Sequence, residues 1–144
     1  MSQSQTALDA GTVYQRVTQL LNEFFAHLDR AEPVGHLLTE EAEFRGVTGR
    51  DAVVELLLSL SRKRDETGRT SRHFSSNISI DELGEGRYRV RSLVVVLSRN
   101  TQPVEAGELL AGDHDDVVEF DDEGTVRFVS RAMTPAFKLD LATA

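Results

Sequence analysis

The apolar residues of this chain change their spacing about halfway along, and that change limits the folds it can adopt. In the first half they recur at three- and four-residue intervals, which is the period of an amphipathic helix. From residue 70 onward they alternate, as in strands that bury one face. Helices followed by a run of strands predict an α+β fold with helices packed on one face of a sheet.

Three helices are predicted in the first half. The first has an apolar face made of Val13, Val17, Leu20, Leu21, Phe24, Phe25 and Leu28. Thr12 and Gln15 are placed to form its capping box, and Pro33 suits the first turn of a short second helix that reaches Leu38. A short strand is expected at 42–45. The third helix follows and buries Val53, Val54, Leu57 and Leu58.

The second half predicts an antiparallel meander of four strands, at 72–80, 88–99, 108–120 and 126–133. The apolar run at 93–97 is typical of a central strand that is buried on both faces. In the first of these strands, alternation predicts one face made of His73, Ser75, Asn77 and Ser79. It predicts that the opposite face is made of Phe74, Ser76, Ile78 and Ile80.

Composition narrows the class of protein. The 144 residues fit a single domain, with a core at about 10–135 and flexible ends. The 24 acidic and 16 basic residues give a net charge of −8, which argues against a nucleic-acid partner. No apolar run reaches the roughly 18 residues of a membrane span, and Met1–Gln5 lacks the layout of a secretion signal. We therefore expect a cytoplasmic protein with no membrane partner.

His73 is the best candidate for chemistry. The chain has four histidines and no cysteine, and imidazole is the side chain that gains or loses a proton near neutral pH. The alternative is a solvent-facing polar strand. Asp29, at the end of the first helix, is the matching carboxylate, although an aspartate there also suits the cap of the next helix.

The other histidines carry weaker expectations. His114 alternates with Asp116, Val118 and Phe120 on a predicted strand, whereas His27 and His36 are expected to be partly exposed helix residues. Asp116 is expected to pair with Arg131 on the next strand, because opposite charges there stabilise a sheet. A zinc site made by His73, His114 and a carboxylate has no close ligand spacing to support it, so no metal site is predicted.

Several motifs occur in an order that resembles a known family. They are Asp29-Arg30-x-Glu32, Glu43-Phe44-Arg45-Gly46, Gly49-Arg50-Asp51-Ala52, Arg72-His73-x-x-x-Asn77, Gly112-x-His114-x-Asp116 and Arg127-Phe128-x-x-Arg131. Over roughly residues 10–135 the chain resembles the SnoaL-like branch of the nuclear transport factor 2 superfamily. The resemblance implies a cone-shaped, curved antiparallel sheet wrapped by three N-terminal helices. It also implies an apolar pocket at the wide end and a homodimer formed through the outer face of the sheet.

The resemblance also implies a site. Asp29 and His73 match the carboxylate and the strand histidine of scytalone-dehydratase-like members, which form an acid–base pair that needs no cofactor or metal. A carboxylate bound to one ring nitrogen fixes the tautomer and leaves the other nitrogen to move a substrate proton. We expect this pair to lie within hydrogen-bond reach, with His73 lining the largest apolar pocket. Substrate contacts are expected from Phe25, Phe44, Asn77 and His114.

Departures from the family pattern limit which of the family's reactions this chain is expected to catalyse. Tyrosines that polarise the substrate carbonyl in such dehydratases are replaced here by Leu28 and Phe44, so no oxyanion stabiliser is identified. Residues 89–93 lack the carboxylates that flank an arginine in limonene-epoxide-hydrolase-like members. Glu43 with Phe25 is a poor match to the base and tyrosine of ketosteroid-isomerase-like members.

These observations favour a small cofactor-independent enzyme that acts on an apolar, carbonyl-bearing molecule such as a polyketide- or steroid-like compound. The reaction would be a dehydration, an isomerisation or a cyclisation. The alternative is a non-catalytic module of the same fold that binds a small molecule or dimerises, since a fold does not settle its function.

Overall fold

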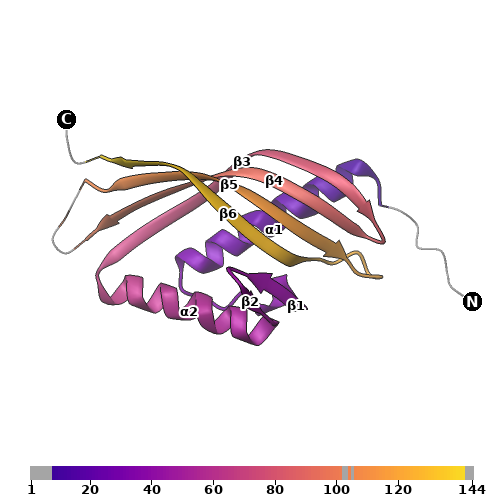
Figure 1. The fold of residues 1–144 in the computed structure, drawn as a ribbon, viewed down its shortest axis with the longest axis horizontal. Coiled ribbons are helices and arrows are strands. Elements are labelled where there is room, and N and C mark those ends of the chain that lie inside the picture. Colours follow the sequence, from indigo (N-terminus) through magenta and orange to yellow (C-terminus); the bar gives the residue numbers. More distant parts are fainter. Residues whose placement is uncertain (1–7, 102–103, 105, 142–144) are drawn as a thin grey trace, which may run out of the picture.

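The computed structural model describes residues 8–101, 104 and 106–141. Its elements, in chain order, are α1 (Ala10–Asp29), the 3-10 helix η1 (Gly35–Leu37), β1 (Leu38–Phe44), β2 (Val47–Thr48), α2 (Arg50–Glu66), β3 (Arg69–Gly84), β4 (Arg87–Asn100), β5 (Glu108–Phe120) and β6 (Val126–Asp140). Figure 1 shows a long curved sheet with α1 lying across one face and α2 below one end. Pro103, in the loop before β5, lies outside the described residues, as do 1–7 and 142–144 of the predicted flexible ends. β6 continues to Asp140, beyond the predicted core limit at about 135.

The sheet is larger than predicted. Strands β3 to β6 form the expected antiparallel meander, but the full order of the six strands is β2-β1-β6-β5-β4-β3. β1 runs parallel to β6, and β2 pairs with β1. The sheet is therefore mixed rather than purely antiparallel. Its extra strands cover an edge of β6 that would otherwise expose unpaired backbone groups.

Two of the three predicted helices are α-helices, and the middle one is a single 3-10 turn. Leu37 lies in this turn as expected, but Pro33 precedes its N-cap Val34, and Leu38 already begins β1 and is the register partner of Phe128. Because β1 begins at Leu38, no residues remain for a longer helix. The cap of α1 also differs from the prediction, since the Thr12 backbone N–H donates to the Asp9 carboxylate at 2.8 Å.

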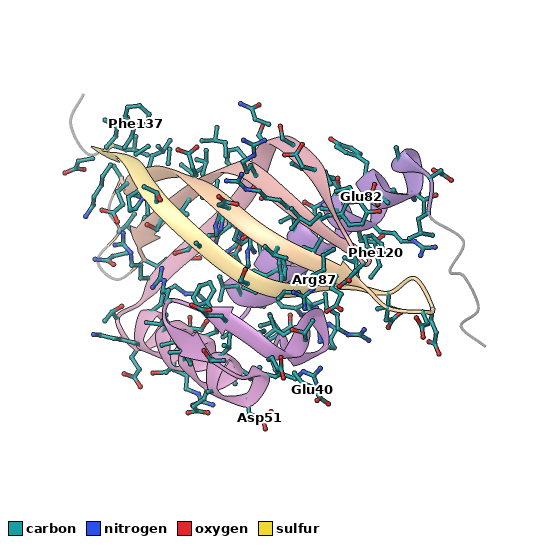
Figure 2. All side chains as sticks on the ribbon, turned by 45° about the vertical axis from the view of Figure 1, so that its right-hand side comes forward. Glu40, Asp51, Glu82, Arg87, Phe120 and Phe137 are labelled. Atoms are coloured by element: carbon teal, nitrogen blue, oxygen red, sulfur yellow. The ribbon has the colours of Figure 1, made fainter. Side chains whose placement is uncertain are left out.

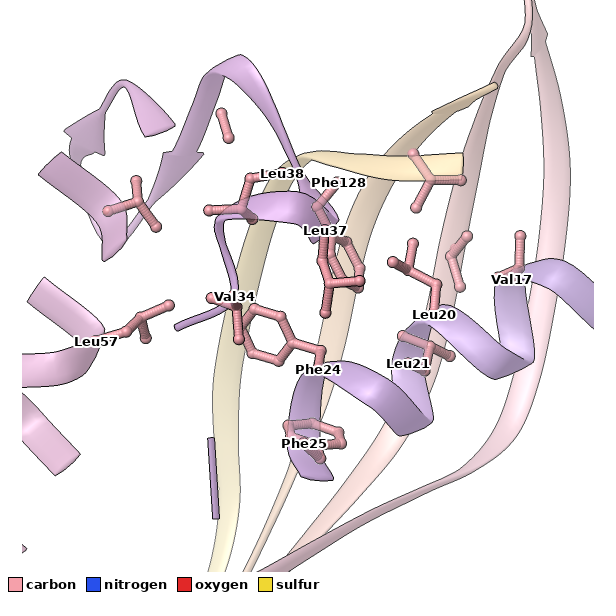
Figure 3. Close-up of a cluster of buried hydrophobic side chains, with 14 of the residues drawn as sticks. Val17, Leu20, Leu21, Phe24, Phe25, Val34, Leu37, Leu38, Leu57 and Phe128 are labelled. Carbon is pink, nitrogen blue, oxygen red and sulfur yellow. The ribbon is translucent and has the colours of Figure 1, made fainter. Parts of the chain in front are cut away.

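The core lies between α1 and the inner face of the sheet. Phe24 and Phe128 meet edge to face with ring centroids 5.3 Å apart, and Figure 3 shows Val34 and Leu37 beside these rings. Nothing in the described helices is long and apolar enough to cross a membrane. The cytoplasmic location and the single-domain boundaries stay predictions from the sequence.

A bulge in β3 changes which residues face inward. The pairing with β4 shifts between Ser76 and Ser79, and Asn77 has a left-handed φ of 53°. His73 faces inward before the bulge, whereas Ile78 and Ile80 pack against the core after it. One extra residue in a strand reverses the alternation beyond it. The predicted polar face that joins His73 with Asn77 and Ser79, and the predicted shared face of Phe74 with both isoleucines, were therefore wrong.

The outer face of the sheet has two ends of different character. One end, called the apolar end below, carries Phe74, Leu93, Val95, Leu97, Leu109, Phe137 and Leu139. The other carries ion pairs such as Arg89–Asp115 and Arg91–Asp81. Figure 2 shows Phe137 and Arg87 far apart along the sheet. Leu97 is 41% exposed, so in this chain the predicted burial of β4 on both faces was wrong.

Candidate active site

Asp29 holds His73 by both its ring and its backbone. The Nδ1 of His73 lies 2.5 Å from Oδ1 of Asp29, and the His73 backbone N–H donates to Oδ2 at 3.1 Å. The two side chains are only 16% and 9% exposed. This contact confirms that the two residues lie within hydrogen-bond reach. Because Nδ1 is engaged, the ring direction is fixed and Nε2 is the nitrogen left for a substrate.

The end of α1 that carries Asp29 is held by two residues of α2. Arg64 donates from Nη2 to the Asp29 carbonyl at 3.2 Å, and the Ser61 hydroxyl donates to the Leu28 carbonyl at 3.5 Å. The last carbonyls of a helix have no partner within the helix, so these donors stabilise its end. The capping alternative for Asp29 was wrong, since η1 has no side-chain cap.

Phe25 separates the two inward-facing histidines. Its ring stacks on that of His73 with centroids 5.0 Å apart and planes 10° apart. The His114 ring meets Phe25 edge-on, with centroids 5.9 Å apart. One buried phenylalanine therefore contacts both imidazoles.

The His73 side chain lines a hollow at the free edge of the sheet, called the β3 hollow below. It has a volume of about 360 Å³ and is lined by Asn22, Phe25, Ala26, Asp29, Arg30, Arg72, His73, Phe74 and Ser75. A larger hollow of about 430 Å³ lies at the other end of α1, beside Tyr14 and Tyr88. The expectation that His73 lines the largest pocket was therefore wrong. Phe25 packs directly on the His73 ring and takes up part of the space that a larger pocket would need.

A second polar group lies behind Phe25 on β5 and β6. Arg131 donates to both oxygens of Asp116 at 3.0 Å, with both side chains buried, which confirms the predicted cross-strand pair. The guanidinium also lies 4.3 Å from the Phe128 ring centroid and 4.6 Å from that of Phe24. Such contacts between a cation and aromatic faces are favourable when water is excluded.

His114 belongs to this group, and its burial favours the neutral form. Its Nδ1 lies 3.6 Å from Oδ1 of Asp116. Burial lowers the pKa of His114 below the ordinary 6.5, the Asp116 contact offsets part of this shift, and the charge of Arg131 lowers the pKa further. A neutral imidazole here can donate or accept a hydrogen bond without bringing a charge into the core.

Four buried polar atoms in or beside this group make no hydrogen bond within the described part of the chain. They are Oγ of Ser75, Oγ of Ser92, Nδ1 of His114 and Nη1 of Arg131. Ser92 is the register partner of His114, and buried polar groups usually have a partner. Sequence reasoning placed Ser75 on one face with His73 but missed Ser92 as a site candidate, because only strand register reveals its neighbours. It also missed Ser61 and Arg64, whose contacts depend on helix packing.

Two of the expected substrate-binding residues lie away from the β3 hollow. Asn77 is exposed at the bulge, and Phe44 packs against Phe24 in the core with centroids 6.5 Å apart. The structure brings Asp29, His73 and Phe25 together, with His114 on the far side of Phe25. In the described part of the chain, no group of three or more His, Cys, Asp or Glu side chains is arranged to hold a metal ion.

Comparisons with known proteins identify the fold. No family model and no curated protein matches the sequence. A protein assigned as a scytalone dehydratase from Novosphingobium aromaticivorans is 25% identical, with a TM-score of 0.75 and 94% of each chain covered. ActVI-ORFA from Streptomyces coelicolor is 23% identical, with a TM-score of 0.76, covering 88% of this chain and 98% of its own.

A hexachlorocyclohexane dehydrochlorinase, LinA type 2, is 14% identical, with a TM-score of 0.73, covering 92% of this chain and 90% of its own. These likenesses confirm the resemblance to the SnoaL-like branch of the nuclear transport factor 2 superfamily. The chain has the α+β fold of that branch.

Proposed function

We propose that this protein is a cofactor-independent proton-transfer enzyme of the lyase or isomerase class, with Asp29 and His73 as its acid–base pair. The observation that carries the proposal is the double contact of one carboxylate with the ring and backbone of His73. A histidine oriented in this way beside a hollow is the arrangement that general base catalysis requires. The names of two structural neighbours, a dehydratase and a dehydrochlorinase, support elimination chemistry.

The proposed reaction uses Nε2 of His73. It removes a proton from the carbon next to a substrate carbonyl, while Asp29 keeps accepting the Nδ1–H and stabilises the imidazolium that forms. The electron pair of the broken C–H bond forms a double bond as the group on the adjacent carbon leaves. In a dehydration the imidazolium returns its proton to the leaving hydroxide, so the product is water and the ring is neutral again.

The surroundings support an apolar substrate that carries a carbonyl, such as a polyketide- or steroid-like compound. Phe25 lines the β3 hollow and stacks on the His73 ring, and aromatic rings bind flat apolar molecules well. His114, neutral and beside Phe25, is proposed to hydrogen-bond substrate that reaches past that ring.

The test is a survey of apolar ketones and β-hydroxyketones with wild type and single variants. His73→Gln keeps a polar group but removes the titratable nitrogen, so turnover should fall by roughly 10²–10⁴-fold. Asp29→Asn should lower turnover less if the aspartate only orients the ring. His36→Gln, which replaces a histidine away from the β3 hollow, is the matched control. Equal turnover by His73→Gln and wild type would end this mechanism.

A non-catalytic binding module of the same fold is the second candidate. It is favoured by Phe44 and Leu28, which stand where dehydratases of this branch carry tyrosines, and Phe44 is packed into the core. In that case both variants would change the affinity for a ligand modestly, and wild type would turn over none of the survey compounds.

We also propose that two copies form a twofold homodimer through the apolar end of the sheet. Phe74, Leu97, Phe137 and Leu139 are 51%, 41%, 66% and 55% exposed, and they come from β3, β4 and β6, with Leu109 of β5 between the last two strands. Contiguous apolar patches of this kind are unusual on a monomer and mark interaction sites. A twofold axis would place the same patch of each copy against the other, with a buried area above roughly 1,000 Å² in total.

A further inference from the structure

We propose that Phe25 is a gate over a buried subsite that binds the carbonyl oxygen of the substrate. The subsite, called the serine subsite below, is made by Ser75, Ser92 and His114. Its part in the reaction rests on the proposed function, because it stabilises the negative charge that develops on this oxygen while His73 removes a proton. Its ability to bind an oxygen-bearing ring compound does not depend on turnover.

The hydroxyl groups of Ser75 and Ser92 are buried, and neither has a hydrogen-bond partner among the described residues. Ser75 is the register partner of Val94, and Ser92 precedes Val94 by two residues, so all three side chains lie on the inner face. The serines are therefore diagonal neighbours, roughly 7–8 Å apart at Cα, with room for one ligand oxygen between their hydroxyls. Because an unpartnered buried hydroxyl is unfavourable, two of them beside a candidate site indicate a ligand.

His114 completes the serine subsite from β5. It is the register partner of Ser92 and is only 7% exposed. Its burial lowers its pKa below the ordinary 6.5, and a neutral imidazole keeps one N–H donor. Two hydroxyls and one imidazole N–H thus lie on three neighbouring strands. Donors that are already in place where negative charge develops are the arrangement that stabilises an oxyanion.

Phe25 covers the serine subsite in this structure. Its ring contacts His73 on β3 and His114 on β5. Because β4 lies between these two strands, the ring lies over the part of β4 that carries Ser92. Phe25, His73 and Ser75 line the β3 hollow, whereas Ser92 and His114 do not. A ligand in the hollow therefore reaches the whole subsite only when the Phe25 side chain turns aside.

Fluorescence titration with 2-naphthol and with 2-methylnaphthalene, a ring compound of similar shape without oxygen, tests the subsite. We expect Ser92→Ala to weaken the binding of 2-naphthol about fivefold to tenfold, because one hydrogen bond is lost. The binding of 2-methylnaphthalene should not change. Ser75→Ala should act in the same direction. Ser79→Ala, at an exposed position of β3 on the outer face, is the matched control and should affect neither probe.

Three results of this titration would overturn the proposal. They are failure of wild type to bind 2-naphthol, an equal effect of Ser92→Ala on the two probes, and an equal effect of Ser92→Ala and Ser79→Ala on 2-naphthol.

A crystal structure of wild type with 2-naphthol tests the gate. We expect the Phe25 ring to have turned away from His114, with the naphthol oxygen within hydrogen-bond distance of Ser92 Oγ. An unmoved ring with 2-naphthol bound elsewhere would overturn the gate and the subsite together.

Turnover separates this proposal from the proposed function. On a ketone that wild type converts, Ser92→Ala should lower kcat by roughly 10²-fold, the usual effect of losing one oxyanion donor. The pH at which activity falls should stay that of wild type, since His73 still takes the proton. If Ser92→Ala weakens 2-naphthol binding while wild type turns over nothing in the ketone survey, the subsite stands and the proposed reaction fails. If His73→Gln loses turnover while Ser92→Ala equals wild type in turnover and binding, the reaction stands and the subsite fails.

Discussion

Asp115 and Asp116 are neighbours on β5, and each binds one arginine through two parallel hydrogen bonds on opposite faces of the sheet. On the outer face, Arg89 donates to Asp115 at 2.9 and 2.6 Å, with side chains 45% and 49% exposed. On the inner face, Arg131 donates to Asp116 at 3.0 Å twice, with side chains 1% and 0% exposed. The two contacts have the same geometry and opposite surroundings.

The comparison shows that solvent exposure, rather than hydrogen-bond geometry, decides how much an ion pair contributes to the free energy of unfolding. The outer pair is screened by water, so either partner can be lost at little cost. Losing one partner of the inner pair would leave a charge buried without compensation. The inner pair also contacts His114 and lies beneath the Phe25 ring. The outer face of β5 thus carries a solvated ion pair, whereas its inner face carries a buried ion pair that contacts residues of the candidate site.

The strongest way to test this contrast is to remove one charge from each pair. We expect Asp116→Asn to lower the free energy of unfolding by about 3–5 kcal/mol, because it leaves the Arg131 guanidinium buried and uncompensated. Asp115→Asn, one residue away, is the matched control and should change it far less. Urea denaturation of both variants measures the difference. Similar losses in the two variants would refute the contrast between the faces.

The apolar end of the outer face gives the next largest expected effect. If two copies pair there, Leu97→Glu should place a charge in the interface and weaken the dimer by about 2 kcal/mol or more. Ser79→Glu, on the outer face beside Arg91, is the control and should leave the dimer intact. Sedimentation velocity at micromolar concentration distinguishes the two. A monomeric wild type would contradict the homodimer.

The smallest expected effect concerns His114 and pH. Burial lowers the pKa of His114 in the folded protein below 6.5, whereas the unfolded chain should titrate near the ordinary value. Between these two values the unfolded state binds more protons, so stability falls as the pH is lowered from about 6.5. The slope from this one group is at most about 1.4 kcal/mol per pH unit. His114→Gln should remove that part of the pH dependence, and His36→Gln should retain it. An unchanged slope in His114→Gln would show that another group is responsible.

Local patterns in the sequence determined much of the fold. The spacing of Val13 to Leu28 specifies an amphipathic helix whatever the rest of the chain does, and α1 and α2 lie where this spacing placed them. The run from Glu108 to Phe120 forms β5 at the predicted ends. The pairing of Asp116 with Arg131 was also predictable, because a tight turn at 121–124 fixes the neighbour of each residue in the hairpin.

Features that depend on contacts between distant segments were decided only by the tertiary structure. The left-handed Asn77 inserts one residue into β3 and reverses its faces, and no local pattern marks that position. β1 joins β6 because the meander leaves an open edge. Asp29 and His73 were proposed as partners through a family resemblance. The contact between them joins residues 44 positions apart in the sequence. It forms only because α1 ends beside the free edge of β3. Such packing between distant segments, unlike helical or strand periodicity, is not encoded within a short stretch of sequence.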